Sequence, residues 1–487
     1  MIREQASESL LFYSAREIAQ PAATNFYWRL AAAVKDWKAL AAPFAAAFSE
    51  GLGRPTDPVV YLKVFLVGYL ENIVYDTDLA ERIADSLAIR QFLGYGLAEA
   101  PPDHSSISRN RALIGQHCAI EEVLGRAVAL CREAGLVSGE EAALDSSLIP
   151  ANASLSSLRS VKTGRGVREH LRQVRERNAE AQEKVKVEVS NAEFRSTTDP
   201  DARLAKKRGT PRDMCYRATQ VTDAEAGIIL AADCARADEG EVVAARPVVA
   251  RAQENLEATG GSLGTLVADA GYDDSDFHAF VEGLGATPLT NYQPDSRKPE
   301  GFRKADFTYD AGCDRYRCPE GKWARYAGAS SGVRQYRTRA LDCKDCEHRR
   351  DCIGEGKRRT LTRQAHEASR ERNLARCHTE EGRAALRRRK HIVEPPFGHM
   401  KTYGGVSLIN CRGLMKARVK VMMAAVAWNL KKLVRAMARE AAPALAAPGR
   451  ALSDLSRLLL ALFAALARSC PFGRRPHQFP TRQPIAP

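Results

Sequence analysis

Three acidic residues lie where the surrounding sequence favours a buried strand or a helix end. Asp145 falls inside the apolar run 142–149, Asp269 ends the short apolar run 265–269, and Glu394 follows a basic stretch. A carboxylate inside or at the end of a buried strand is costly unless it is paired or binds a metal ion. Taken singly, each residue is better explained as a cap, a turn residue or an ion-pair partner.

Three carboxylates that meet would suit metal-assisted cleavage of a phosphodiester. That reaction needs an activated nucleophilic oxygen, a stabilised leaving oxygen and neutralisation of the phosphate charge. Two divalent ions about 3.5–4 Å apart supply all three. Mg²⁺ prefers carboxylate oxygens and keeps several of its waters, so three acids suffice to hold the ions. The set therefore points to Mg²⁺- or Mn²⁺-dependent chemistry.

The strings around these acids carry a family resemblance. The four strings are Leu144–Ser154, Thr198–Arg203, Val267–Asp273 and Val393–Lys401, and a further stretch, Pro58–Gly115, contains Asp103-His104-Ser105-Ser106. In this order they resemble the catalytic motifs, and the preceding helical domain, of the DDE transposases of bacterial insertion sequences. The likeness spans residues 10–438, and ordered motifs over that span are far more specific than any single one.

The resemblance implies a fold, an activity and a partner. The fold class is α/β, with a ribonuclease-H-like mixed-sheet core, an all-α N-terminal domain and a small cysteine-rich insertion. Asp145 would bridge two Mg²⁺ or Mn²⁺ ions, while Asp269 and Glu394 each complete one side. The enzyme would bind the terminal inverted repeats of its element, cleave a DNA strand and join the freed 3′-OH to target DNA, as a homodimer and without a nucleotide cofactor.

Positive residues near Glu394 and in the helical domain are candidates for DNA phosphate contacts. They are Arg387, Lys390, Lys401, Arg109 and Arg111. The residue before a proline disfavours helical geometry, and proline is welcome in the first turn of a helix. We therefore expect Glu394 at a helix start, with Lys401 on that next helix. The alternatives are a solvated basic face near Glu394 and a packing helix around Arg109.

Five cysteines fall within forty residues and suggest a zinc module. The preferred ligands are Cys318, Cys343, Cys346 and Cys352, and Cys313 or His348 could substitute. Thiolates at this spacing suit tetrahedral Zn²⁺, which can fold a segment too small for its own core. The alternative is reduced, unligated thiols.

Hydrophobic periodicity gives the elements that must position these residues. We expect helices throughout residues 1–115, among them 58–70 and a single helix over 76–89. A hairpin then follows, over 216–222 and 227–234, with alternating helices and strands up to residue 289. The predicted domains are a helical N-terminal domain (1–117), a catalytic domain (118–440) with a cysteine-rich insert (306–358), and a low-complexity tail (441–487). A solvated helix over 167–189 and a basic helical stretch over 357–391 complete the prediction.

Composition bounds the class of protein. The 487 residues carry 73 Lys and Arg against 59 Asp and Glu, a surplus of fourteen positive charges that permits a polyanionic partner. No secretory signal or apolar run of about 20 residues is present, so we expect a cytoplasmic protein without a membrane span. The glycine pairs lack the lysine of a phosphate-binding P-loop. Two rival functions stay open: a ribonuclease-H-like nuclease without strand transfer, and an inactive DNA-binding relic.

Overall fold

The computed structural model describes most of the chain. The described residues are 25–48, 57–117, 120–180, 189–206, 209, 211–292, 301–330 and 332–446. The chain divides into two compact units, Met1–Val434 and Arg435–Pro487. Most of the predicted tail, 447–487, lies outside the described residues. No helix among the described residues is long and apolar enough to cross a membrane.

The N-terminal region is helical, as the periodicity predicts. Its elements are α2 (Phe26–Ala33), α3 (Trp37–Ala41), η1 (Ala42–Ala47), α4 (Pro58–Leu70), α5 (Asp76–Asp85), α6 (Leu87–Leu93), α7 (His104–His117) and α8 (Ile120–Glu133). Asp57 caps α4 by accepting a hydrogen bond from Val59 N at 2.8 Å, and Pro58 occupies the first turn. The interior of α4 is almost wholly apolar, and eight of its residues are buried. This helix forms the centre of the region.

The single helix expected over 76–89 is wrong, because the chain breaks at Ser86. Ser86 takes an extended backbone conformation and begins α6, its Oγ accepting a hydrogen bond from Ile89 N at 3.3 Å. Serine competes for backbone donors in this way and is therefore favoured at helix caps over helix interiors. The apolar spacing continues across the break, so periodicity alone did not reveal it.

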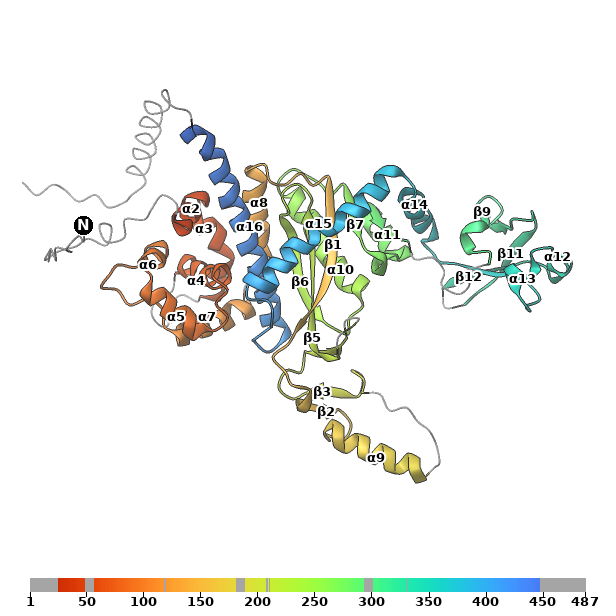
Figure 1. Cartoon of the computed structure of the whole chain (residues 1–487), viewed down its shortest axis with the longest axis horizontal. Coiled ribbons are helices and arrows are strands. Elements are labelled where there is room, and N and C mark those ends of the chain that lie inside the picture. The colour runs from red at the N-terminus through yellow and green to blue at the C-terminus, as the bar shows by residue number, and fades with distance from the viewer. Residues whose placement is uncertain are drawn as a thin grey trace, which may run out of the picture. The chain divides into compact units, whose positions relative to one another are not determined.

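A mixed sheet follows the helical region (Figure 1). Its strands are β1 (Glu141–Pro150), β4 (Arg203–Ala205), β5 (Asp213–Asp223), β6 (Ile229–Arg236), β7 (Thr265–Ala268) and β8 (Thr287–Thr290). β5 pairs antiparallel with β1 on one side and with β4 and β6 on the other. β1, β7 and β8 run parallel in that order. The predicted hairpin is confirmed as β5–β6, and β1 and β7 are adjacent.

Helices cover both faces of this sheet. α10 (Glu241–Glu257) and α8 pack on the face to which Ala142 and Leu144 contribute, within the main hydrophobic core. α15 (Glu380–Tyr403) crosses β5, β1, β7 and β8, and its Ile392 and Val393 pack against Ala143 (Figure 1). Successive residues of β1 thus alternate between the two faces, as the two-residue period of a strand requires.

The segment after β8 is less helical than the charge pattern predicts. Residues 357–391 contain a strand, β13 (Thr360–Arg363), followed by α14 (Glu367–Cys377) and the first half of α15. Thr379 separates the two helices and caps α15 by accepting a hydrogen bond from Gly382 N at 3.0 Å. α11 (Ser275–Gly283) lies against α14. The last long helix is α16 (Leu414–Ala446), and its Asn429 makes two hydrogen bonds to the backbone of Ile229 on β6.

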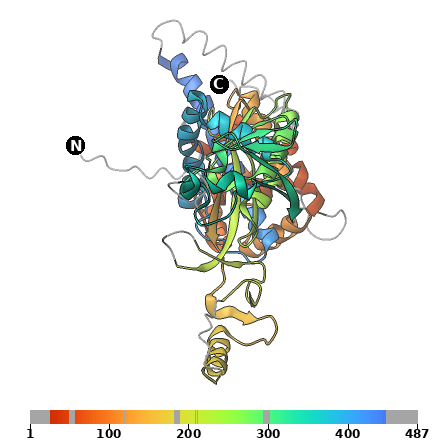
Figure 2. The same cartoon turned by 90° about the vertical axis from the view of Figure 1, so that its right-hand side faces the viewer.

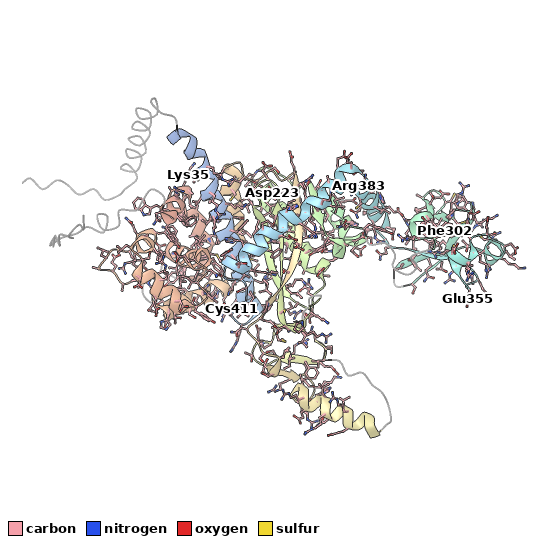
Figure 3. All side chains as sticks on the ribbon, viewed as in Figure 1. Lys35, Asp223, Phe302, Glu355, Arg383 and Cys411 are labelled. Carbon is pink, nitrogen blue, oxygen red and sulfur yellow. The ribbon has the colours of Figure 1, made fainter. Side chains whose placement is uncertain are left out.

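Two excursions leave the central sheet. The first holds η2 (Leu155–Ser157), β2 (Leu158–Ser160), α9 (Val167–Glu180) and β3 (Phe194–Ser196); Figure 2 shows α9 in yellow beside β2. The second, the cysteine-rich module, holds β9 (Thr308–Asp310), β10 (Arg315–Arg317), β11 (Trp323–Ser330), β12 (Val333–Arg337), α12 (Ala340–Lys344) and α13 (Arg349–Ile353), with β13 closing its antiparallel sheet. The module has its own small core of five buried side chains, against which Phe302 packs (Figure 3).

Candidate functional site

The pairing of β1 with β7 brings two of the three predicted acids together. The parallel ladder ends at Ala143 and Val267, and two residues beyond each of these comes Asp145 or Asp269. β1 continues alongside β5, whereas β7 ends and Asp269 begins the short helix η3 (Ala270–Tyr272). Asp269 Oδ1 accepts a hydrogen bond from Gly271 N at 3.0 Å. The two carboxylates therefore lie at the point where neighbouring strands separate.

Burial and neighbouring charges set the state of Asp145. Its pKa is raised to about 6, first by burial and then by the negative charges of Asp269 and Glu241. Arg389 acts in the opposite direction, because its Nη1 lies 3.7 Å from Asp145 Oδ1. That distance is too long for a hydrogen bond. One arginine therefore does not offset the cost of holding this carboxylate in an ionised state.

Glu241, which the sequence reasoning missed, is a third carboxylate at the site. It begins α10, and its Oε1 lies 2.6 Å from Arg217 Nη1. An atom at the Cβ position of residue 271 would lie 2.8 Å from Glu241 Oε2 and 3.1 Å from Asp269 Oδ1. Residue 271 is glycine, and because it has no Cβ, the carboxylates of Glu241 and Asp269 can both lie close to this position. In the sequence, an acid in the first turn of a helix looks like an ordinary response to the helix dipole.

Buried polar groups without hydrogen bonds gather beside Asp145. Gln220 lies directly opposite Asp145 on β5, so both side chains stand on the sheet face that α15 covers. The Gln220 side chain is 1% exposed, and neither its amide oxygen nor its nitrogen has a hydrogen-bond partner. Thr222 Oγ1 and Arg389 Nη1 are likewise buried and unpartnered. Such atoms are rare in folded proteins, and their grouping here marks a place not arranged for stability alone.

Glu394 lies in the middle of α15, so the prediction of a helix start is wrong. Pro395 and Pro396 follow it inside the same helix, which ends only at Tyr403. Each proline removes a backbone donor and normally disfavours a helix interior. Here the apolar side chains on both sides of the proline pair pack on the sheet, among them Ile392, Val393, Phe397 and Met400, which are at most 8% exposed. Packing therefore keeps the helix continuous.

The predicted DNA-contact residues of this region share one side of α15 with Glu394. Arg387, Lys390, Glu394 and Lys401 follow at spacings of three, four and seven residues, which keep them on one side of a helix. Lys401, expected on the next helix, is on α15, and its Nζ donates a hydrogen bond to Ser147 Oγ on β1. Arg387, Lys390 and Glu394 are exposed. No hydrogen bond or ion pair among the described residues links Glu394 to Asp145 or Asp269.

The two arginines predicted on α7 have different surroundings. Arg111 Nη2 lies 2.6 Å from Asp76 Oδ1, and the guanidinium stands 4.5 Å from the centre of the Phe65 ring. Asp76 and the nearby Tyr69 raise the pKa of Arg111 against the opposing effect of burial. Arg109, in contrast, is exposed. Arg111 therefore contributes to packing in the helical region, which is one of the alternatives for this helix.

The acidic set fits a hard divalent cation by its chemistry. Carboxylate oxygens are the ligands that Mg²⁺ and Mn²⁺ prefer. A cation between Asp145 and Asp269 would also offset the repulsion that raises the pKa of Asp145. Within the described ranges, however, no three His, Cys, Asp or Glu side chains form a group that could hold a metal ion.

Four cysteines and a histidine converge in the cysteine-rich module. Cys318, Cys343, Cys346, Cys352 and His348 line one small cavity, whereas Cys313 is exposed elsewhere. Burial raises the pKa of Cys352, and the other three thiols raise it further. The turn at Cys318 is tight, since Gly321 N donates to its carbonyl at 2.9 Å and Lys322 N to its Sγ at 3.2 Å. The turn is formed by Cys318-Pro319-Glu320-Gly321.

Two known protein families match the chain. A family described as a transposase domain (DUF772) matches residues 15–113, and a family described as a transposase DDE domain matches residues 317–434, which include Glu394. The chain therefore carries a transposase domain in its N-terminal region and a transposase DDE domain in its C-terminal region. Transposases act on DNA, and DDE transposase domains generally use divalent metal ions. Both descriptions agree with the resemblance to DDE transposases that the strings in the sequence carry.

Other comparisons find weaker or no likeness. No curated protein matches the transposase chain. Among solved structures, the cryo-EM structure of the piggyBac transposase synaptic complex with hairpin DNA is 10% identical, with 93% of this chain and 84% of that chain covered and a TM-score of 0.34.

Proposed function

We propose that this transposase binds the terminal inverted repeats of its own element, cleaves a DNA strand there, and joins the freed 3′-OH to target DNA. The observation that carries the proposal is the meeting of Asp145 and Asp269 where β1 and β7 separate. The pairing of β1 with β7 ends two residues before each carboxylate, and the pKa of Asp145 is raised in part by the charge of Asp269. Carboxylates with a raised pKa in a shared site are typical of catalytic centres.

Asp145 and Asp269 would hold the divalent ions, with Glu394 supplied from α15 and Glu241 alongside. Divalent ions bound there would supply Lewis acidity and charge neutralisation at the phosphate. Arg389, with its Nη1 3.7 Å from Asp145 Oδ1, would be a further positive charge beside the site. Lys401, bonded to Ser147, and the exposed Arg387 and Lys390 would bind the DNA phosphates on the same side of α15.

The fold of the core is proposed to be ribonuclease-H-like. The antiparallel hairpin β5–β6 beside three parallel strands, with acids on the adjacent strands β1 and β7, supports this assignment. The proposal also includes a homodimer, because two element ends must be paired before strand transfer.

A cleavage and joining assay tests the proposed function. The substrate is a duplex with the inverted repeats that flank the gene, with Mg²⁺ or Mn²⁺ and a target plasmid. We expect single-strand cuts at the repeat ends followed by joining, and a loss of at least about a thousandfold in Asp145→Asn and Glu394→Gln. Asp276→Asn, at an exposed position on α11, is the control and should cut normally.

The joining step separates this function from its two rivals. Cuts without joined products would support a nuclease without strand transfer. Binding without any cut, in the wild-type chain with either metal, would support an inactive DNA-binding relic. Wild-type activity in both carboxylate variants would show that the proposed site is not the catalytic one.

We also propose that the four cysteines bind one structural zinc ion. Their convergence on a single cavity supports a thiolate site, and zinc binding would stabilise a module with a very small core. Metal analysis of freshly reduced protein should find one zinc per chain, lost in Cys343→Ser/Cys346→Ser and kept in Cys313→Ser. Zinc-free, folded wild-type protein would contradict this assignment.

A further inference from the structure

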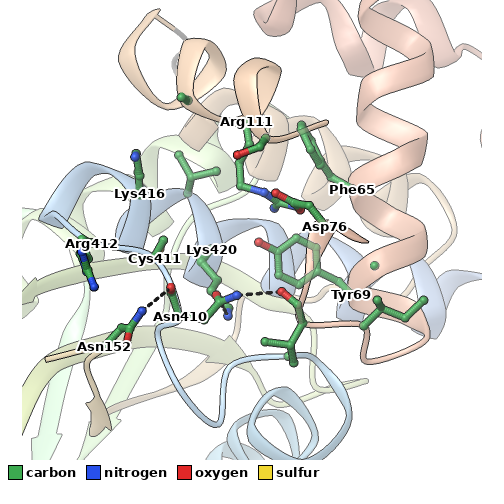
Figure 4. A pocket seen from close by; sticks show the side chains of 17 residues that line it. Phe65, Tyr69, Asp76, Arg111, Asn152, Asn410, Cys411, Arg412, Lys416 and Lys420 are labelled. Atoms are coloured by element: carbon green, nitrogen blue, oxygen red, sulfur yellow. Dashed lines mark hydrogen bonds and ion pairs between the residues drawn. The ribbon is translucent and has the colours of Figure 1, made fainter. Parts of the chain in front are cut away.

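A large cavity lies beside the helical region, and its lining includes none of the acids Asp145, Asp269, Glu241 and Glu394. Its volume is about 390 Å³, and it is lined by α4, α5, α7, the segment 405–412 and the start of α16 (Figure 4). Figure 4 shows Lys416 and Arg412 on one side, Phe65 and Tyr69 on the other, and Lys420 between them. A cavity of this size is in the range of small-ligand sites.

Hydrogen bonds join the two sides of this cavity. Asn410 Nδ2 donates to Val74 O at 2.7 Å, and Gly405 N donates to Asn72 Oδ1 at 2.9 Å. Asn152, just beyond β1, donates from Nδ2 to Asn410 O at 2.9 Å. The walls are therefore tied together by backbone and amide contacts, so the cavity is formed without a ligand.

The charge of the lining is strongly positive. Four cationic side chains face one carboxylate, that of Asp76, and Arg111 already occupies that carboxylate at 2.6 Å. This leaves Lys420, Arg412 and Lys416 without a carboxylate partner among the described residues. Arg412 and Lys416 are exposed, whereas Lys420 is 7% exposed. The lining therefore has an excess of positive charge at both its floor and its rim.

Lys420 is the most unusual of these residues. Its Nζ donates hydrogen bonds to two neutral acceptors, Leu408 O at 3.0 Å and Asn410 Oδ1. Burial lowers its pKa to about 8, so the ammonium is retained at neutral pH at a cost. A buried charge is usually paired, because desolvation is otherwise uncompensated. An anion bound in the cavity would compensate the charge of Lys420.

We propose that this cavity binds a phosphate group, and that in the working transposase it is a backbone phosphate of bound DNA. Lysine and arginine side chains donate the hydrogen bonds that phosphodiester oxygens accept. The cavity exceeds one phosphate in size, and its exposed rim cations can receive a continuous strand. This inference rests on the proposed function, because that function supplies the DNA.

DNA binding by the full chain tests the proposal. Fluorescence anisotropy with a random-sequence duplex, in EDTA and over a range of NaCl, measures both affinity and its salt dependence. We expect Arg412→Ala/Lys416→Ala to weaken binding by about tenfold or more and to reduce the salt slope by about 2, as loss of two phosphate contacts requires. Lys35→Ala/Lys38→Ala removes two exposed cations outside the cavity and is the matched control, with a change of about threefold or less.

A buried variant adds an independent arm. Lys420→Met keeps the length of the side chain and removes its charge, and we expect this variant to bind DNA more weakly. The rim variant Arg412→Ala/Lys416→Ala should keep the thermal unfolding midpoint of the wild type. Equal losses in the rim variant and in the Lys35/Lys38 control would overturn the proposal in favour of general electrostatics. Unchanged binding in the rim variant would overturn it outright.

The source of the phosphate is settled by calorimetry on the DNA-free chain. Tight binding of inorganic phosphate that is lost in the rim variant, together with unchanged DNA binding, would assign the cavity to a free phosphate compound and overturn the DNA assignment. Because DNA binding is measured in EDTA, it does not depend on cleavage. Cavity-dependent binding without cleavage would contradict the proposed function alone, and cleavage with cavity-independent binding would contradict this inference alone.

Discussion

Two sets of acidic residues, which come within four positions of each other at Asp269 and Asp273, have opposite surroundings. Where β1 and β7 separate, Asp145 and Asp269 lie near each other and near Glu241, and the pKa of Asp145 is raised to about 6. On and before α11, acids are paired with arginines of α14. Asp273 makes two hydrogen bonds with Arg370, and the pKa of Glu282 is lowered to about 2, foremost by Arg372.

The difference separates carboxylates that stabilise the fold from carboxylates suited to a ligand. Asp273 is 1% exposed in its side chain and meets Arg370 at 2.8 Å, so its charge is compensated inside the protein. Asp145 meets its nearest arginine at 3.7 Å and faces two further acids. An uncompensated negative charge of this kind costs stability in the free protein and favours a bound cation.

Asp269 and Asp273 offer the sharpest test of this contrast, since only four residues separate them. Asp269→Asn should reduce DNA cleavage by at least about a thousandfold while leaving stability unchanged. Asp273→Asn should instead cost about 2–4 kcal/mol of stability, because Arg370 then loses the buried carboxylate that pairs with its charge. The folded fraction of this variant should still cleave DNA. Chemical unfolding and single-turnover cleavage measure the two effects. Lost stability in Asp269→Asn together with lost cleavage in Asp273→Asn would contradict this contrast.

Glu241 should behave as a member of the first set despite its ion pair with Arg217. Glu241→Gln keeps the size of the side chain and removes its charge, so the affinity for Mn²⁺ should fall by about tenfold, with cleavage partly restored by more Mn²⁺. Calorimetry with Mn²⁺ measures the change. Glu254→Gln, in an exposed pair on the same helix, is the control and should bind Mn²⁺ as the wild type does. Equal affinities in both variants would remove Glu241 from the site.

The ionisation of Asp145 should lower the stability of the folded protein in a pH-dependent way. Its pKa in the folded protein, about 6, lies above the ordinary value of 3.8, so ionisation destabilises the fold increasingly as pH rises from about 4 through 6. Asp145→Asn should therefore be more stable than the wild type at pH 7.5, by up to about 3 kcal/mol, and equal to it at pH 4. Urea unfolding without divalent ions at both pH values checks this. A less stable variant at pH 7.5 would contradict it.

Glu282 should show the opposite pH dependence. Its folded pKa of about 2 lies below the ordinary value of 4.5, so its contribution is complete above pH 4.5 and is lost as pH falls through about 2. Glu282→Gln should cost about 1–2 kcal/mol at pH 7, a discounted value because Arg372 is half exposed. The difference from the wild type should shrink below pH 4.5 in urea unfolding. A pH-independent difference would indicate lost packing instead.

Much of the fold could be predicted from the sequence, because local patterns specify it. The apolar helix α4, the hairpin β5–β6 and the strand before Asp269 all follow from periodicity and turn residues. The break at Ser86 and the continuous α15 could not, since the first depends on one cap and the second on packing across the proline pair. Both are decided by contacts that hydrophobic spacing does not encode.

The site was predictable only where a motif marks it. Asp145 and Asp269 stand in recognisable strings on strands that the fold makes adjacent. Glu241 and Gln220 are brought to Asp145 by the sheet and by α10, and nothing in their local sequence separates them from a helix-start acid or a strand amide. The pairing of Asp273 with Arg370 spans 97 positions, so its structural role was equally hidden.

The central claim is that divalent ions bind between the carboxylates of β1 and β7. Iron-directed cleavage of the polypeptide tests it most directly: Fe²⁺ replaces Mg²⁺ in the full chain, ascorbate and peroxide generate radicals at the ion, and mass spectrometry locates the breaks. We predict breaks at residues 143–147, 241 and 267–272 that are suppressed by excess Mg²⁺ and absent from Asp145→Asn/Asp269→Asn. Breaks absent from these segments, or unchanged by Mg²⁺ and by the double substitution, would contradict the claim.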